Sequence, residues 1–252
     1  MILHDLNKKA ENMTPRIEQL REESLNAVNR ISAERALLIT EFYQNHVAFG
    51  DTVPVQRAKS FRYLLENKTV CINHGELIVG ERGPAPKATP TYPEITVHSL
   101  QDLDILNSRK KVWFRVDEET REAYREIIIP FWSGRSNRDR IMQAMEQPWH
   151  DAYQAGIFTE FMEQRAPGHT VAGSKIYRKG MLDILADVED ALSALDYLND
   201  PQAFERAEEL KAMRIAAEAL IRFAGRHAEK LDELAAGETD EVRRNELLKM
   251  AK

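Results

Sequence analysis

Residues 161–171 bring together side chains that could bind and protonate a small molecule. Pro167 and Gly168 end the preceding helix and force a turn. The turn presents His169, and Arg165 on the last helical turn can point the same way. An Arg and a His at a helix end can hold an anionic or hydroxylated ligand. The structural alternative is that Arg165 complements the helix C-terminus and His169 caps a loop. Residue chemistry alone favours the two interpretations equally.

The rest of the chain offers few catalytic candidates. The seven histidines are scattered, and no HxxxH or CxxC pair of the kind that binds metal occurs. No Walker A, GxGxxG or GxSxG motif is present either. Cys71 lies among apolar neighbours, which is more typical of a small buried side chain than of a nucleophile. His227 lies on the apolar stripe of a helix and is interpreted as a packed core residue rather than a ligand.

Composition excludes several classes of function. The chain has 252 residues, of which 43% are hydrophobic, enough to bury a core, and a net charge of −6. An acidic balance gives no basic face for nucleic acid. A single cysteine rules out an intramolecular disulfide, and no apolar run is long enough for a signal peptide or membrane span. We therefore expect a cytoplasmic protein without nucleic-acid or membrane partners.

The first quarter of the chain, residues 1–67, is expected to be helical. Thr14 and Pro15 are typical of a helix start, because Thr caps free N–H groups and Pro is tolerated in the first turn. Apolar residues at spacings of three and four over 17–46 predict one amphipathic helix or a pair. Val53 begins another helix.

Residues 70–94 have a different pattern. A short apolar run at 77–79, closed by glycine, predicts a buried strand. The segment that follows, 81–94, is rich in proline, which disfavours helix and central strand alike. We expect an ordered loop laid over the body of the protein. On composition alone, a flexible linker remains the alternative.

Helices return over residues 100–252, giving a mostly α chain with a few short strands. Short helices are expected over 100–147, and long apolar stripes over 182–195 and 204–234 predict two longer helices. A last, charged helix is expected after residue 240.

Three motifs in one order resemble those of glycyl radical enzymes of the pyruvate formate-lyase superfamily. They are Gly80–Pro84 with Pro90–Glu94, Pro130–Trp132 with Arg138 and Asp139, and Arg165–Thr170. The resemblance covers the chain from Met13 onward and is strongest to the dehydratase and C–X lyase (eliminase) branch. It implies that residues 1–252 are the N-terminal portion of a ten-stranded α/β barrel.

Two family motifs are absent from the chain. The thiyl cysteine of these enzymes lies in a Gly-Cys-Val-Glu setting, and Cys71 does not match it. The radical glycine motif, similar to Arg-Val-Ala-Gly-Tyr, is missing too. We therefore expect either a truncated product or one subunit of a split enzyme. The split enzyme is favoured, because an isolated piece of a barrel would expose apolar faces.

The resemblance also implies a function. A split glycyl radical lyase of anaerobic metabolism would eliminate water, amine or sulfite from a small polar substrate, with Phe161, Arg165 and His169 on one wall of its pocket. His169 would hydrogen-bond the substrate hydroxyl or act as proton donor. A complementary chain would supply the catalytic Cys and Glu and the radical Gly, and a radical S-adenosylmethionine activase would install the radical. This chain alone would be inactive and bind no cofactor directly.

Several points stay open at this stage. The substrate, the leaving group and any association with a bacterial microcompartment are not indicated by the sequence, and the complete enzyme is expected to be a homo-oligomer. The alternative function is a catalytically inactive helical adaptor or regulatory homologue of such an enzyme. An adaptor would explain the helical stripes, but it would not explain the Pro-Gly loops at 80–94 and 165–170.

Overall fold

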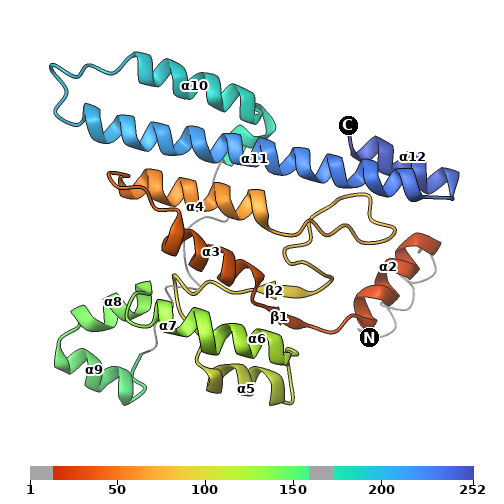
Figure 1. The fold of residues 1–252 in the computed structure, drawn as a ribbon, viewed down its shortest axis with the longest axis horizontal. Helices are drawn as coiled ribbons and strands as arrows, with labels where there is room; N and C mark the ends of the chain where they lie inside the picture. The colour runs from red at the N-terminus through yellow and green to blue at the C-terminus, as the bar shows by residue number, and fades with distance from the viewer. Residues whose placement is uncertain (1–13, 159–172) are drawn as a thin grey trace, which may run out of the picture.

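The computed structural model describes residues 14–158 and 173–252. In these ranges the chain is mostly helical, with a few short strands, as expected (Figure 1). The elements are α2 (Pro15–Asn26), β1 (Arg30–Ser32), α3 (Glu34–Asn45), α4 (Val53–Asn67), β2 (Ala88–Pro90), α5 (Leu100–Ser108), α6 (Glu118–Ala123), the π-helical turn η1 (Tyr124–Ile128), α7 (Ile129–Trp132), α8 (Asn137–Ala144), α9 (Gln147–Gln154), the 3₁₀ turn η2 (Gly173–Tyr177), α10 (Met181–Ser193), α11 (Ala203–Gly237) and α12 (Glu241–Met250). No helix of the described part is long and apolar enough to cross a membrane.

The first helices begin where the sequence predicts. The Thr14 hydroxyl accepts a hydrogen bond from the Ile17 amide at 3.4 Å, and Pro15 lies in the first turn of α2. The apolar pattern over 17–46 forms a pair of helices, which was one of the two alternatives. Between them lies β1, which the sequence analysis did not anticipate.

The small sheet is parallel. β1 pairs with β2 in the register Arg30 to Ala88 and Ser32 to Pro90. On its other side β1 contacts the 114–116 segment, where the Ile31 amide donates to the Arg115 carbonyl at 3.0 Å. β1 is therefore held from both sides although it is only three residues long.

The strand expected at 77–79 does not form. The Asn73 amide donates to the Glu76 carboxylate at 3.0 Å, which closes a turn through Gly75, whose φ of +78° suits glycine. The chain leaves this turn with Leu77 and Ile78 exposed, at 52% and 87%. Strands instead form where a partner lies alongside, at β1 and β2.

The main core lies between α3 and the helical segment α6–η1–α7. Two buried polar side chains are paired across it: Trp132 Nε1 donates to the Thr40 hydroxyl at 2.8 Å, and the Tyr124 hydroxyl donates to the Thr91 hydroxyl at 2.6 Å. The π-helical turn η1 runs directly into α7, which contains Pro130, so the helical segment α6–η1–α7 continues through a proline.

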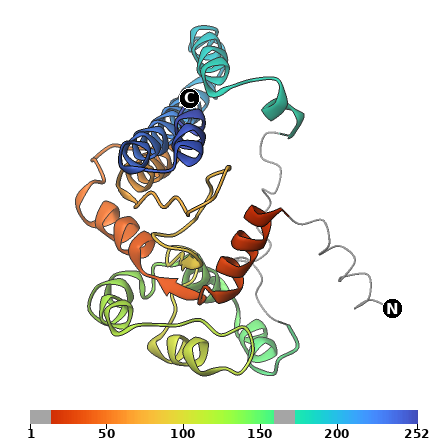
Figure 2. The same ribbon diagram turned by 90° about the vertical axis from the view of Figure 1, so that its right-hand side faces the viewer.

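The long helix α11 organises a second layer. It packs against α4 on one side and contacts α10 and α12 on others. Both views place this helical layer on one side of the loop that precedes β2, with the sheet and α5 to α9 on the other side (Figures 1 and 2). The residues of α11 that are buried are mainly small: Ala203, Ala207, Ala212, Ala217, Ala219, Leu231 and Ala235.

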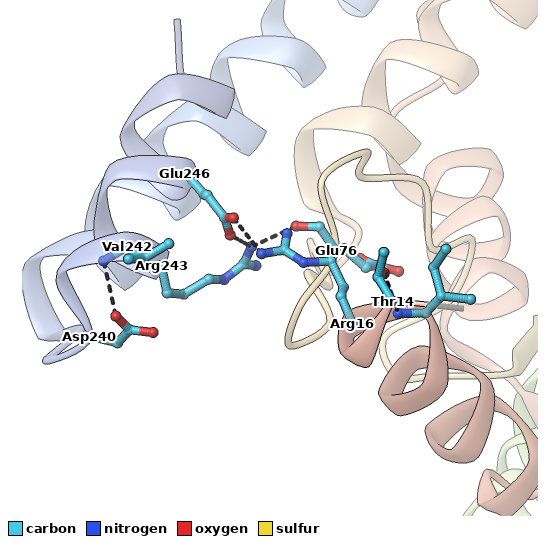
Figure 3. A network of polar contacts seen from close by, with 8 residues as sticks. Thr14, Arg16, Glu76, Asp240, Val242, Arg243 and Glu246 are labelled. Atoms are coloured by element: carbon cyan, nitrogen blue, oxygen red, sulfur yellow. Dashed lines mark hydrogen bonds and ion pairs between the residues drawn. The ribbon is translucent and has the colours of Figure 1, made fainter. Parts of the chain in front are cut away.

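A polar network joins the two ends of the described chain (Figure 3). Arg243 on α12 is 7% exposed and donates to the Glu76 carbonyl at 2.7 Å and to Glu246 at 3.1 Å. Arg16 on α2 forms an ion pair with the same Glu246. Asp240 caps α12 by accepting from the Val242 amide at 2.9 Å. The turn at 73–76 is thus fixed between α2 and α12.

Arg226 joins α11 to the C-terminus of α4. Its guanidinium donates to the carbonyls of Leu65 at 2.6 Å and Lys68 at 2.8 Å, groups that a helix end leaves without intrahelical partners. We expect Arg226→Ala to lower the free energy of unfolding by about 2 kcal/mol, because two charge-assisted hydrogen bonds are lost. Urea unfolding followed by circular dichroism measures the change.

Arg222→Ala on the same helix is the matched control. Arg222 pairs with Glu229 at 2.7 Å on the surface, where both side chains are more than half exposed. Exposed ion pairs contribute little, so this variant should stay within about 0.5 kcal/mol of the wild type. Equal effects of the two substitutions would contradict a structural role for Arg226.

Candidate functional site

The three residues predicted to contact a substrate, Phe161, Arg165 and His169, lie outside the described residues. The structure describes the chain up to Phe158 and again from Gly173. The described part of the candidate site is therefore the set of residues that precede this segment and hold it in position.

Phe158 is anchored on α9. Its ring lies 5.7 Å from that of Trp149 in an edge-on arrangement and 5.8 Å from that of Tyr153, measured between centroids. Aromatic contacts of this kind contribute beyond their buried area. The chain therefore has a fixed point three residues before Phe161.

Tyr153 connects α9 to α8. Arg138 in the first turn of α8 donates to the Tyr153 hydroxyl at 3.1 Å, and its guanidinium lies 5.8 Å from the ring centroid. The buried Ser136 caps α8 by accepting from the Asp139 amide at 3.1 Å. Asp139 in turn accepts from the Gly134 amide at 3.0 Å. The Arg138 and Asp139 pair singled out in the sequence thus orders both the start of α8 and its contact with α9.

The start of α8 is bonded to the proline-rich loop. The Asn137 amide donates to the Glu94 carbonyl at 3.0 Å, and the Arg138 amide donates to the Ile95 carbonyl at 3.0 Å. Two of the three motifs, separated by about forty residues in the sequence, therefore meet through backbone hydrogen bonds. The third motif follows Phe158 along the chain.

Arg35 on α3 holds the other side of this loop. Its guanidinium binds both carboxylate oxygens of Glu94, donates to the Thr91 carbonyl at 3.1 Å, and lies 3.9 Å from the Tyr92 ring centroid. A planar guanidinium can make all these contacts at once, which a lysine cannot. The loop is therefore ordered, as expected, and the flexible linker is excluded.

Tyr124 also contacts the proline-rich loop, through its hydrogen bond to Thr91. Burial raises the pKa of Tyr124 to about 12, although its hydrogen bond to Thr91 opposes this shift. The phenol therefore remains a hydrogen-bond donor at neutral pH. Neither Arg35 nor Tyr124 was anticipated as part of the frame, because each acts on residues more than thirty positions away.

A groove of about 920 Å³ opens between the two layers, and sequence analysis did not anticipate it. Its walls come from residues 32–35, α4, the 79–83 segment, residues 90–92, α11 and residues 250–252. Lys68 lies in it and donates to the Arg82 carbonyl at 2.8 Å. Burial lowers the pKa of Lys68, while nearby Glu34 raises it.

His227 lies on the wall of this groove. Its Nδ1 is 2.9 Å from the Phe223 carbonyl oxygen, and its ring stacks edge-on against the Phe223 ring at 4.4 Å. These contacts agree with the interpretation of His227 as a packed residue rather than a ligand. It lines an open groove, however, and is only half-buried.

Cys71 has the surroundings of an unreactive thiol. Burial raises its pKa, and the nearby carboxylates of Glu81 and Glu76 add to the shift. A raised pKa disfavours the reactive thiolate. Among the described residues, no group of three or more His, Cys, Asp or Glu side chains could hold a metal ion.

His98 should make stability depend on pH. Burial lowers its pKa from the ordinary 6.5, with Asp102 opposing the shift. Below pH 6.5 the unfolded chain therefore binds more protons than the folded one, so stability rises with pH in that window and falls on acidification. His98→Gln should flatten this part of the profile. Urea unfolding of both proteins between about pH 8 and pH 5 tests this, and parallel profiles would contradict it.

Comparison with known proteins gives one consistent family. The pyruvate formate lyase-like family model matches residues 12–252. The chain is 50% identical to trans-4-hydroxy-L-proline dehydratase from Clostridioides difficile over 94% of its length. It is 29% identical to isethionate sulfite-lyase from Nitratidesulfovibrio vulgaris over 90% of its length.

Solved structures agree with this match. The crystal structure of the Clostridioides difficile hydroxyproline dehydratase with trans-4-hydroxy-L-proline bound superposes with a TM-score of 0.89 at 49% identity. A glycyl radical enzyme from Archaeoglobus fulgidus superposes with a TM-score of 0.82 at 29% identity. These matches cover 95% and 94% of this chain. The chain spans only about 30% of the length of the relatives it matches.

Proposed function

Because this chain belongs to the pyruvate formate lyase-like family, we propose that it is the N-terminal part of a glycyl radical lyase and forms one wall of its substrate pocket. Its fold is correspondingly the N-terminal portion of a glycyl radical enzyme barrel. The catalytic Cys and Glu and the radical Gly lie on a complementary part, and an activase installs the radical.

Among the eliminations open to this family, we favour loss of water from a small hydroxylated amino acid. The observation that carries this choice is the 50% identity to trans-4-hydroxy-L-proline dehydratase across nearly the whole chain. Identity to the isethionate sulfite-lyase is only 29%. A carboxylate on such a substrate also suits Arg165, since a guanidinium binds a carboxylate through two parallel hydrogen bonds.

The residues of this chain would bind and orient the substrate. Phe161 would pack against its carbon skeleton, Arg165 would hold its anionic group, and His169 would hydrogen-bond the hydroxyl or give it a proton as it leaves. The radical on the complementary part would supply hydrogen-atom abstraction at the neighbouring carbon. The contacts from α3 through the loop, α8 and α9 to Phe158 support this proposal, because binding groups need a rigid frame.

Reconstitution tests the proposal. The chain is combined with the complementary part and an activase, and turnover is measured on trans-4-hydroxy-L-proline and on isethionate. We expect dehydration of the former and no sulfite release from the latter.

The chain alone is the control. It should show no turnover and no glycyl doublet in the electron paramagnetic resonance spectrum after exposure to the activase. A doublet on the chain alone would contradict the division of roles between the two parts. Binding of the complementary part without any turnover would instead favour the adaptor function.

A further inference from the structure

The groove between the two layers has an apolar floor on its α4 and α11 sides. It is lined there by Phe61, Leu64, Leu65, Val79, Phe223, Ala224, Ala228, Leu231 and Met250. Phe61 is 36% exposed, and Ala224 is also exposed, so part of this floor faces solvent. A concave surface lined mainly by apolar side chains is typical of a binding site.

Several of the charged side chains that line the groove already have partners within the chain. Lys68 donates to the Arg82 carbonyl, and Arg35 binds Glu94. Glu34 accepts from the Thr69 amide at 2.8 Å. A small charged ligand could reach Lys68, Arg35 or Glu34 only by breaking these contacts, and the other two cations of the lining, Arg82 and Lys252, are exposed. The groove therefore suits an apolar occupant.

The relatives indicate where such an occupant would come from. The match covers about 30% of the Clostridioides difficile dehydratase, in sequence and in structure alike. Most of the dehydratase chain thus lies outside the matched segment. In the assembled enzyme, that remainder is the part available to cover the apolar faces of the matched segment. Met250 and Ala251 line the groove, so the last matched residues lie against its floor.

We propose that this groove is the docking surface for an apolar segment of the complementary part, resting on the proposed function for the existence of that part. The segment packs on the α4–α11 floor and contacts the 79–83 segment. Docking there would place the complementary part beside β2 and the proline-rich loop, since Pro90 and Tyr92 line the same groove.

Two alanines on α11 allow a matched test. Ala224 is exposed and lines the groove, whereas Ala236 is exposed on the same helix and is not among the groove residues. Ala224→Glu puts a charge on the apolar floor, and Ala236→Glu puts the same charge outside it. The probe is the portion of the Clostridioides difficile dehydratase outside the matched segment, co-expressed with the full 252-residue chain. The amount captured per chain is measured by affinity purification.

We expect the wild type and Ala236→Glu to capture equal amounts, and Ala224→Glu to capture at least about tenfold less, since burying an unpaired charge is costly. Circular dichroism of the variants alone checks that both fold. Equal capture by Ala224→Glu would overturn the groove assignment while leaving the proposed function standing. No capture by the wild type would show that the chain does not bind the complementary part, and this would overturn the docking proposal as well. Self-association of the chain that Ala224→Glu abolishes would make a second copy the occupant and overturn the proposal as well.

Discussion

Gly83→Ala is expected to lower the free energy of unfolding by about 3 kcal/mol, because an added methyl group has no space there. A Cβ at this buried position would lie 2.1 Å from the Ala88 carbonyl oxygen and 2.7 Å from the Ala88 Cβ. These atoms belong to strand β2, so the clash cannot be relieved by turning a flexible side chain. Relief would require the backbone at Gly83 or strand β2 to shift, and Ala88 is the residue of β2 that pairs with Arg30 of β1.

Gly80→Ala provides the matched control three residues earlier in the same segment. A Cβ at Gly80 meets no atom within 4 Å, so this variant should stay within about 0.5 kcal/mol of the wild type. Urea unfolding of both variants, followed by circular dichroism, separates the two effects. A Gly83→Ala protein as stable as the wild type would show that the loop and β2 are not packed as described.

The helices could be predicted from the sequence because their signals are local. Thr14 with Pro15 and Asp240 each mark a helix start that the structure confirms, and the stripes over 182–195 and 204–234 correspond to α10 and α11. The buried face of α11 could be predicted only in part. Ala207, Ala217 and Leu231 of the predicted stripe are buried, whereas Phe204 and Met213 of the same stripe are at least half exposed. Most of the buried residues are alanines, which allow a close approach to neighbouring helices.

The strands could not be predicted because their cause is not local. β1 and β2 are three residues long, too short for an alternating pattern, and each exists because the other lies beside it. The apolar run at 77–79 carried a stronger local signal, yet no described segment pairs with it.

The contacts that hold the candidate site in place could likewise be predicted only where their signal is local. The sequence motifs included Glu94 and Arg138, but they did not indicate which distant residues contact this part of the protein. Arg35 reaches Glu94 across 59 positions, and Tyr124 reaches Thr91 across 33. Such pairs carry no signature in a single sequence, because either partner alone is an ordinary residue. The groove was missed for the same reason, since its walls come from six separate parts of the chain.

His169→Ala is expected to reduce turnover of the reconstituted enzyme by roughly 100-fold or more if His169 acts in proton transfer. Pro167 and Gly168 are expected to fix its turn, and the proposed function puts its side chain at the substrate. The same variant should leave folding and assembly nearly unchanged. Turnover under saturating substrate, thermal unfolding and capture of the complementary part measure the three properties separately.

His169→Gln separates the two roles open to this residue. A glutamine amide can still hydrogen-bond a substrate hydroxyl, but it cannot act as an acid. Recovery of most of the turnover in His169→Gln would assign hydrogen bonding, whereas a loss equal to that of His169→Ala would assign proton transfer. His74→Ala is the control, because His74 is an exposed histidine whose ring bonds Gln19 at 2.8 Å on the surface. If His169→Ala turns over as fast as His74→Ala, the segment is only a well-capped loop and the pocket assignment fails.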